Sequence, residues 1–119
     1  MENLAFVIED DEDLSNIFMQ ALKAAGFQVE TIRDGAIAQE RIKEANPELV
    51  ILDMHLPHVD GVELLTQIRA DGRLKKTRVI LATADAQLGE YYDNKADLVL
   101  IKPISFSQLR DLTARYRKK

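Results

Sequence analysis

Hydrophobic residues in this chain come in short uninterrupted runs, and charged or turn-forming residues follow each run. Runs that are apolar throughout are typical of strands buried on both faces of a parallel sheet. Four runs have this character: Leu4–Ile8, Leu49–Leu52, Val79–Ala82 and Leu98–Ile101. A fifth segment, Phe27–Ile32, includes the polar Gln28 and Glu30, which favours a strand in a half-exposed edge position.

The segments between these runs have the spacing of amphipathic helices. The clearest stripe has residues at i, i+3, i+4, i+7, i+8 and i+11, and it comprises Leu14, Ile17, Phe18, Ala21, Leu22 and Ala25. Gly26 is the expected end of that helix. Asp34 is placed to cap a second helix, from Gly35 to about Ala45, which Asn46-Pro47 ends.

Three more helices are expected in the second half of the chain. One runs from about Gly61 to Ala70 and buries Val62, Leu65 and Ile68. A less regular one, from Ala86 to Lys95, is interrupted by Gly89. The last begins at Ser105 or Ser107, and its apolar face comprises Leu109, Leu112, Thr113 and Tyr116.

Strand and helix therefore alternate five times, which predicts an α/β fold. Right-handed crossovers would place helices on both faces of a parallel sheet. The five-stranded, doubly wound order 2-1-3-4-5, which is flavodoxin-like, fits this count and puts the half-polar second strand at an edge. The chain has 119 residues, and we expect one domain over residues 1–119.

Composition narrows the class of protein. Apolar residues make up 46% and charged residues 30% of the chain, as in soluble globular proteins. No run is long enough to span a bilayer and no signal-peptide pattern is present, so we expect a cytoplasmic protein without membrane contact. The absence of cysteine excludes disulfides and thiolate metal sites. A net charge of −4 argues against direct binding of nucleic acid.

Chemically active side chains follow each inner strand of the predicted sheet. They are Glu9 and Asp10, then Asp53, then Thr83, then Lys102. Because ligands of open α/β sheets bind at the carboxyl ends of the strands, these side chains are expected to meet at one edge. Each alone has a simpler explanation, such as a helix cap or a solvated charge. Their recurrence at successive strand ends favours a shared site.

The chemistry that suits this group is phosphoryl transfer. Three carboxylates repel one another unless a cation joins them, and oxygen ligands of this kind suit Mg²⁺. Lys102 would neutralise a tetrahedral anion and Thr83 would donate a hydrogen bond to it. Asp53, in the centre, is a candidate nucleophile that would form an aspartyl phosphate.

Four motifs resemble the receiver domain of two-component response regulators, and the similarity spans essentially the whole chain. They are Ile8-Glu9-Asp10-Asp11, the stretch from Leu52 to Gly61, Thr83-Ala84 and Lys102-Pro103. The resemblance implies a phosphoacceptor switch domain and not a turnover enzyme. It implies phosphorylation of Asp53 by a sensor histidine kinase or histidine phosphotransfer protein, and a downstream effector protein or output domain as the second partner.

The resemblance also implies roles for single residues. Asp10 would bind Mg²⁺ directly, with Glu9 assisting and Met54 supplying its backbone carbonyl. Thr83 and Lys102 would contact the phosphoryl oxygens. In the family, phosphorylation shifts an existing equilibrium that reshapes the last two strand–helix units.

The chain departs from the family pattern near its fourth helix. Val99 stands where an aromatic residue is usual, Lys95-Ala96 replaces a common Gly-Ala, and the stretch from Thr83 to Lys102 is a few residues short. These departures keep open the alternative of a pseudo-receiver, a protein-binding module that works without phosphorylation. His55 and Asp85 occupy positions that tune phosphate lifetime in the family, and a role for His55 and His58 as metal ligands or phosphorelay groups is a further alternative.

Two other α/β classes fit less well. A flavodoxin-like cofactor binder needs a phosphate-cradling loop after the first strand, where this chain has five consecutive acids, Glu9 to Asp13. A phosphatase with an aspartyl nucleophile typically has a second acid two residues later, where His55 stands here.

Overall fold

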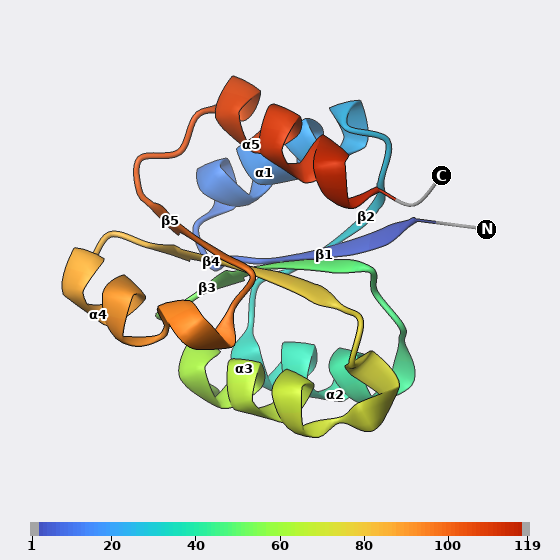
Figure 1. Cartoon of the computed structure of the whole chain (residues 1–119), viewed down its shortest axis with the longest axis vertical. Helices are drawn as coiled ribbons and strands as arrows, with labels where there is room; N and C mark the ends of the chain where they lie inside the picture. The colour runs from blue at the N-terminus through green and yellow to red at the C-terminus, as the bar shows by residue number, and fades with distance from the viewer. Residues whose placement is uncertain (1–2, 118–119) are drawn as a thin grey trace.

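The computed structural model describes residues 3–117 and contains one five-stranded parallel sheet, in the order β2-β1-β3-β4-β5 (Figure 1). The strands are β1 (Leu4–Ile8), β2 (Gln28–Ile32), β3 (Leu49–Asp53), β4 (Arg78–Thr83) and β5 (Leu98–Ile101). The predicted fold class and strand order are confirmed. Residues 1–2 and 118–119 of the expected domain lie outside the described range.

Helices cover both faces of the sheet. Figure 1 shows α1 (Glu12–Ala24) and α5 (Phe106–Thr113) on one face, and α2 (Gly35–Glu44), α3 (Gly61–Ala70) and α4 (Ala86–Tyr91) on the other. Two apolar cores result, because alternate strand residues point to opposite faces. Val7 and Ile51 pack against Phe18 and Leu22 of α1, whereas the Phe6 side of the sheet packs under α2 and α3.

Burial along the strands follows the sequence pattern. β1 and β3 are almost completely buried, whereas β2 is partly exposed at the sheet edge, as its polar residues predicted. Glu30 of β2 makes a two-pronged ion pair with Arg41 of α2, at 2.7 and 2.8 Å. That pair holds the helix against the edge strand.

Aspartates and a serine begin most of the helices. The Asp11, Asp34, Asp85 and Ser105 side chains each accept a hydrogen bond from a backbone N–H in the first turn of α1, α2, α4 and α5. Gly26 follows the end of α1 with φ +104°, a conformation that favours glycine. The predicted cap at Asp34 and helix end at Gly26 are thus both found.

The structure differs from the sequence-based prediction in three places. The fourth helix stops at Tyr91 and a separate 3-10 turn covers Asp93–Lys95, so the predicted helix to Lys95 is wrong in extent. Val62, which was predicted to be buried, is only partly buried. Leu64 takes its place on the side of α3 that faces the core, together with Leu65. Leu74, for which no element was predicted, is 1% exposed and lies in a 3-10 helix, Gly72–Leu74.

Arg73 ties the turn after α3 to the end of α2. Its guanidinium donates hydrogen bonds to the carbonyl oxygens of Ile42, at 2.6 Å, and Ala45, at 2.5 Å, and to the Asn46 side chain at 2.7 Å. These carbonyls belong to the unpaired end of α2, so one side chain from the next helical unit caps it.

Among residues 3–117, no helix has the length and apolar character that a membrane span requires.

Candidate functional site

The candidate site lies at the edge where the parallel strands end. Ile8 of β1 pairs with Leu52 of β3, and Asp53 pairs with Ala82 of β4. Glu9 therefore continues β1 beside Asp53. Thr83 pairs with Ile101 of β5, and Lys102 follows at once. The register thus delivers the predicted residues to neighbouring positions on one edge.

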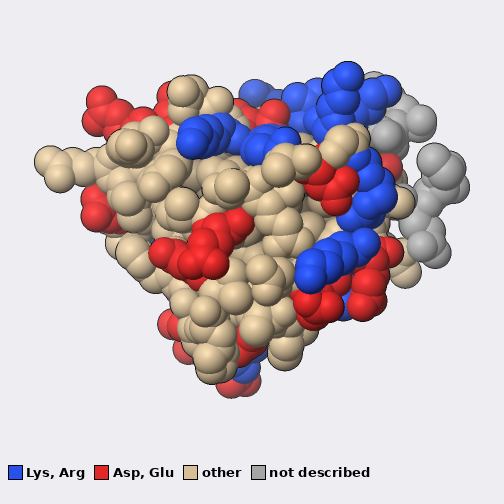
Figure 2. Space-filling model, turned by 90° about the horizontal axis from the view of Figure 1, so that it is seen from below, with Lys and Arg blue, Asp and Glu red and all other residues tan. Residues whose placement is uncertain are grey.

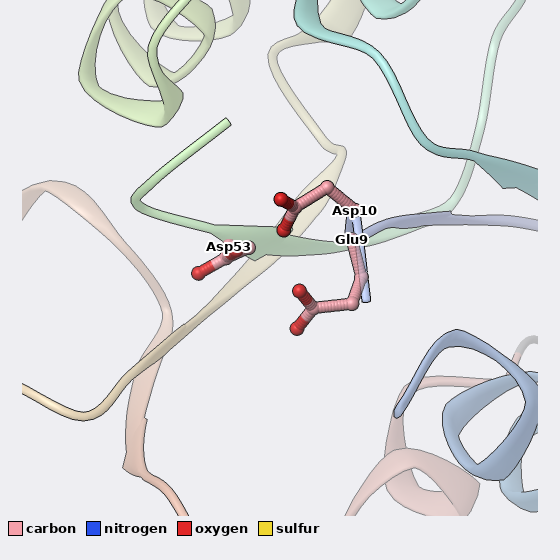
Figure 3. A group of neighbouring side chains, drawn as sticks. All are labelled: Glu9, Asp10 and Asp53. Atoms are coloured by element: carbon pink, nitrogen blue, oxygen red, sulfur yellow. The ribbon is translucent and has the colours of Figure 1, made fainter. Parts of the chain in front are cut away.

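Three carboxylates gather there. Oxygen atoms of Glu9, Asp10 and Asp53 lie within 4.8 Å of one another, and the side chains surround one space at the ends of β1 and β3 (Figure 3). Glu9 and Asp53 are buried, with 1% and 5% of their surfaces exposed, whereas Asp10 is exposed. The group is therefore open to solvent on the Asp10 side.

Lys102 enters the same cluster from β5. Its Nζ lies 2.8 Å from Glu9 Oε1 and 3.3 Å from Asp53 Oδ1. The ammonium group thus joins two buried carboxylates that come from different strands. One cation faces three acids, so this arrangement retains an excess of negative charge and suits a further cation.

The charge balance shows in the pKa values of the buried pair. Burial raises the pKa of Glu9 to about 7, against the opposing hydrogen bond from Lys102 and with a further rise from the neighbouring Asp53. Burial works against the charge of Lys102, yet its contacts with Glu9 and Asp53 outweigh burial and raise the pKa of Lys102. A bound divalent cation would favour the ionised form of Glu9.

The oxygen donors of these residues fit Mg²⁺. Carboxylate oxygens from two strand ends, with the outer side open to water, match the mixed protein and water shell that Mg²⁺ prefers. The Met54 carbonyl accepts a hydrogen bond from the backbone N–H of Gly61 at 3.2 Å and has a second lone pair, but Met54 is fully buried, so its contact with a metal stays a prediction. The predicted ligand set of Glu9, Asp10, Asp53 and Met54 is therefore chemically suitable.

Thr83 lies at the same edge, but its hydroxyl has a local partner. Thr83 is fully buried, and its Oγ1 accepts a hydrogen bond from the backbone N–H of Asp85 at 3.0 Å. The backbone N–H of Lys102 donates to the Thr83 carbonyl at 2.8 Å, which joins the two strand ends. Within residues 3–117, the structure thus brings Glu9, Asp10, Asp53 and Lys102 together, and contact between Thr83 and a phosphoryl group stays a prediction.

Gly61 shapes the site in a way that the sequence analysis missed. A Cβ atom at this position would overlap the carbonyl oxygen of Asp53 and lie 2.8 Å from Met54 Cα. The start of α3 therefore packs directly on the backbone that carries the nucleophile candidate. An Asp-Gly pair such as Asp60-Gly61 is a turn signal in a sequence, but a turn signal does not reveal close backbone packing.

Gly61→Ala is expected to lower the free energy of unfolding by about 2 kcal/mol, because backbone atoms must move to admit the methyl group. Gly72→Ala is the matched control, since nothing lies within 4 Å of a Cβ at Gly72. That variant is expected to be as stable as the parent or more stable by about 0.5 kcal/mol. Urea unfolding measures both, and equal stability of the two variants would contradict this account of Gly61.

The loop after β3 is fixed to the start of α2. The backbone N–H of Gly35 donates to the Pro57 carbonyl at 3.0 Å, and a side chain at Gly35 would overlap the Val59 carbonyl. His58, at φ +70°, makes a 2.5 Å contact between its Nδ1 and Asp34 Oδ2. His58 thus has its own carboxylate partner, while His55 is exposed and its backbone N–H lies 3.4 Å from Asp53 Oδ1.

Gly89, which interrupts the pattern of the fourth helix, and Val99, which replaces the usual aromatic residue, lie next to each other in the structure. A Cβ at Gly89 of α4 would lie 2.8 Å from Val99 Cγ1 and 3.3 Å from Thr83 Cγ2. The glycine that interrupts the helix pattern therefore lets α4 approach both the residue in the usual aromatic position and the threonine of the site. Sequence spacing gave no signal for this contact.

The chain is similar in sequence to a known protein family and to several of its members. Residues 5–114 match the family model described as response regulator receiver domain. The probable methanogenesis regulatory protein FilR2 of Methanothrix harundinacea is 35% identical over 118 residues, which covers 90% of this chain and 76% of that protein.

Two further matches illustrate the range of relatives. The phosphate regulon transcriptional regulatory protein PhoB of Rhizobium meliloti is 37% identical over 106 residues, 87% of this chain and 47% of PhoB. The chain thus spans about half the length of that relative. The solved structure of the response regulator TrrA from Thermotoga maritima, in complex with Mg²⁺-BeF, superposes with a TM-score of 0.83 at 25% identity and covers 98% of this chain and 99% of that one.

Proposed function

The chain belongs to the response regulator receiver domain family of two-component signalling, and from that premise we propose that it is a phosphoacceptor switch, phosphorylated on Asp53 in the presence of Mg²⁺. The observation that carries the proposal is the Lys102 ammonium, 3.3 Å from Asp53 Oδ1, beside three clustered carboxylates. The Mg²⁺-BeF complex of TrrA supports the metal assignment.

In the proposed step, a carboxylate oxygen of Asp53 attacks the phosphorus atom of the donor. A new O–P bond forms as the donor's P–N bond (phosphohistidine) or acyl P–O bond (acetyl phosphate) breaks, and the leaving group departs with the electron pair. Lys102 is placed to stabilise charge on the transferred oxygens. Mg²⁺, when bound by Glu9, Asp10, Asp53 and the Met54 carbonyl, would supply further neutralisation.

Signal output is proposed to pass through Thr83 and α4. A phosphoryl group on Asp53 would offer an acceptor to the Thr83 hydroxyl, in competition with its present bond to the Asp85 N–H. Since Gly89 lets α4 lie close to the methyl group of Thr83, movement of Thr83 would change the packing of α4. Here Val99 takes the place of the aromatic residue usual in the family.

We further propose that this is a signalling module and not a turnover enzyme, working in the cytoplasm. A sensor histidine kinase or histidine phosphotransfer protein would supply the phosphoryl group. A downstream effector protein or output domain would read the altered surface. The net charge of −4 argues against direct nucleic-acid contact by this domain.

Incubation with acetyl phosphate and Mg²⁺ is expected to add one phosphoryl group, detected by intact-protein mass spectrometry. Asp53→Asn should show no addition, because the amide is not a competent nucleophile. Removing Mg²⁺ with EDTA should abolish the addition in the parent, and Asp10→Asn should lower it strongly.

The pseudo-receiver alternative gives the opposite result. An unmodified mass for the parent protein, folded by circular dichroism and supplied with Mg²⁺, would favour a phosphorylation-independent binding module. Addition to Asp53→Asn at the parent rate would place the phosphoryl group elsewhere.

A further inference from the structure

A second feature lies at the opposite edge of the sheet, where the strands begin. There an open hollow of about 1260 Å³ lies between the connections that lead into β3, β4 and β5 and the end of the chain's last helical turn. Eight Lys or Arg residues line it, half of the 16 in the whole chain, against two acids, Glu48 and Asp97. Figure 2 shows Lys and Arg side chains gathered on the side of the molecule where both termini lie in Figure 1.

Three of the eight are used for internal packing. Arg73 caps α2, and Arg69 donates to the Lys95 and Thr77 carbonyls and to Asp97. Arg78 pairs with Asp97 and lies over the Tyr116 ring at 5.7 Å. Asp97 is thereby neutralised by two guanidinium groups.

Five cations remain around the hollow: Lys75, Lys76, Lys95, Arg115 and Arg117. All five are exposed, and with respect to residues 3–117 none forms an ion pair or donates a side-chain hydrogen bond. Helix ends attract basic residues in general, because the helix dipole is negative there. None of the five caps helix carbonyls in the way that Arg73 does. The Lys95 ammonium lies 6.0 Å from the Tyr92 ring centroid and the Arg117 side chain lies beside Gly26, but neither contact neutralises the charge, which is therefore available to a partner.

We propose that this hollow binds an acidic, Asp/Glu-rich segment of a protein partner. At physiological salt the Debye length is about 8 Å, so a short segment in the hollow senses the nearby cations more than the net charge of −4.

The surroundings favour a protein segment over nucleic acid or a membrane. Single-stranded nucleic acid uses aromatic rings as stacking platforms, and the one ring lining the hollow, Tyr116, is already covered by Arg78. A long polyanion would also extend beyond the hollow into the negative field of the remaining surface. Membrane binding needs apolar anchors, and the large exposed apolar side chains of the described chain, Ile17, Ile37, Tyr91 and Ile101, lie outside the hollow.

The test uses the full chain and a dye-labelled peptide of ten alternating Glu and Ser residues, followed by fluorescence anisotropy. Saturable binding is expected, with affinity falling roughly tenfold as salt is raised severalfold. Lys75→Glu/Lys76→Glu should weaken binding about tenfold, because two attractive charges become repulsive. These residues are exposed in a turn, and thermal melting checks that the variant is folded.

Lys23→Glu/Lys43→Glu is the matched control, with the same change in net charge at two lysines that do not line the hollow. Equal weakening by both double variants, or no saturable binding by the parent, would overturn the proposal. So would tighter binding of a single-stranded oligonucleotide or of phosphatidylserine vesicles of the same total charge. The assay contains neither a phosphodonor nor Mg²⁺, so its outcome does not depend on phosphorylation.

Discussion

Lys102→Met is expected to lower the free energy of unfolding by about 3 kcal/mol at pH 8 in the absence of metal. Removing one partner of a buried ion pair leaves an uncompensated buried charge, which costs about 3–5 kcal/mol. Here two carboxylates are left, because Nζ lies 2.8 Å from Glu9 and 3.3 Å from Asp53. Methionine keeps most of the apolar stem, so lost packing contributes little.

The loss should shrink at pH 5, where Glu9 takes up a proton and only one buried charge remains. Urea unfolding with EDTA at both pH values measures this difference. Lys23→Met is the control at an exposed lysine, with an expected change within about 0.5 kcal/mol. An unchanged midpoint for Lys102→Met at pH 8 would show that the ammonium group does not stabilise the acidic cluster.

The metal-free protein is expected to lose stability as pH rises from about 4.5 to about 7. The folded-state pKa of Glu9 is about 7 and the ordinary value is 4.5. Between these values the folded state holds a proton that the unfolded state has released, so rising pH favours unfolding. This shift lowers the free energy of unfolding by about 3 kcal/mol. The loss is complete above pH 7 and absent below pH 4.5.

Unfolding curves in EDTA across this range measure the effect, and Glu9→Gln should remove most of the slope because glutamine does not titrate. Saturating Mg²⁺ should restore stability, and more so at pH 8 than at pH 6, because metal binding requires the ionised carboxylate. A parent profile as flat as that of Glu9→Gln would contradict the raised pKa.

Most of the fold could be predicted because the sequence signals agree with one another. Inner strands buried on both faces must be apolar throughout, and the one strand with polar residues lies at an edge. The extent of α4 could not be predicted in the same way. Gly89 and the pair Tyr91-Tyr92 give no stripe, and the close approach of Gly89 to Val99 is a tertiary contact that the sequence pattern does not show.

The acidic cluster and Lys102 could be predicted because strand direction alone brings strand ends to one edge. The hydrogen bond of the Thr83 hydroxyl depends on a side-chain rotamer and a nearby turn, which the sequence does not specify. The basic hollow was missed for a different reason. Its five remaining cations come from two connections and from the end of the last helical turn, and the net charge of −4 gives no sign that they gather on one face.

The hydrogen bonds of Arg73 connect two of the three helices that cover one face of the sheet, and they leave α4 outside this connection. Because Arg73 joins the end of α2 to the turn after α3, these two helices are held together as one unit. The six-residue α4 beside them buries only Gly89 completely, with Leu88 partly buried against the same core. We therefore expect α4 to yield more easily than α2 and α3, so that a disturbance at the strand ends would deform that helix before it shifted its neighbours.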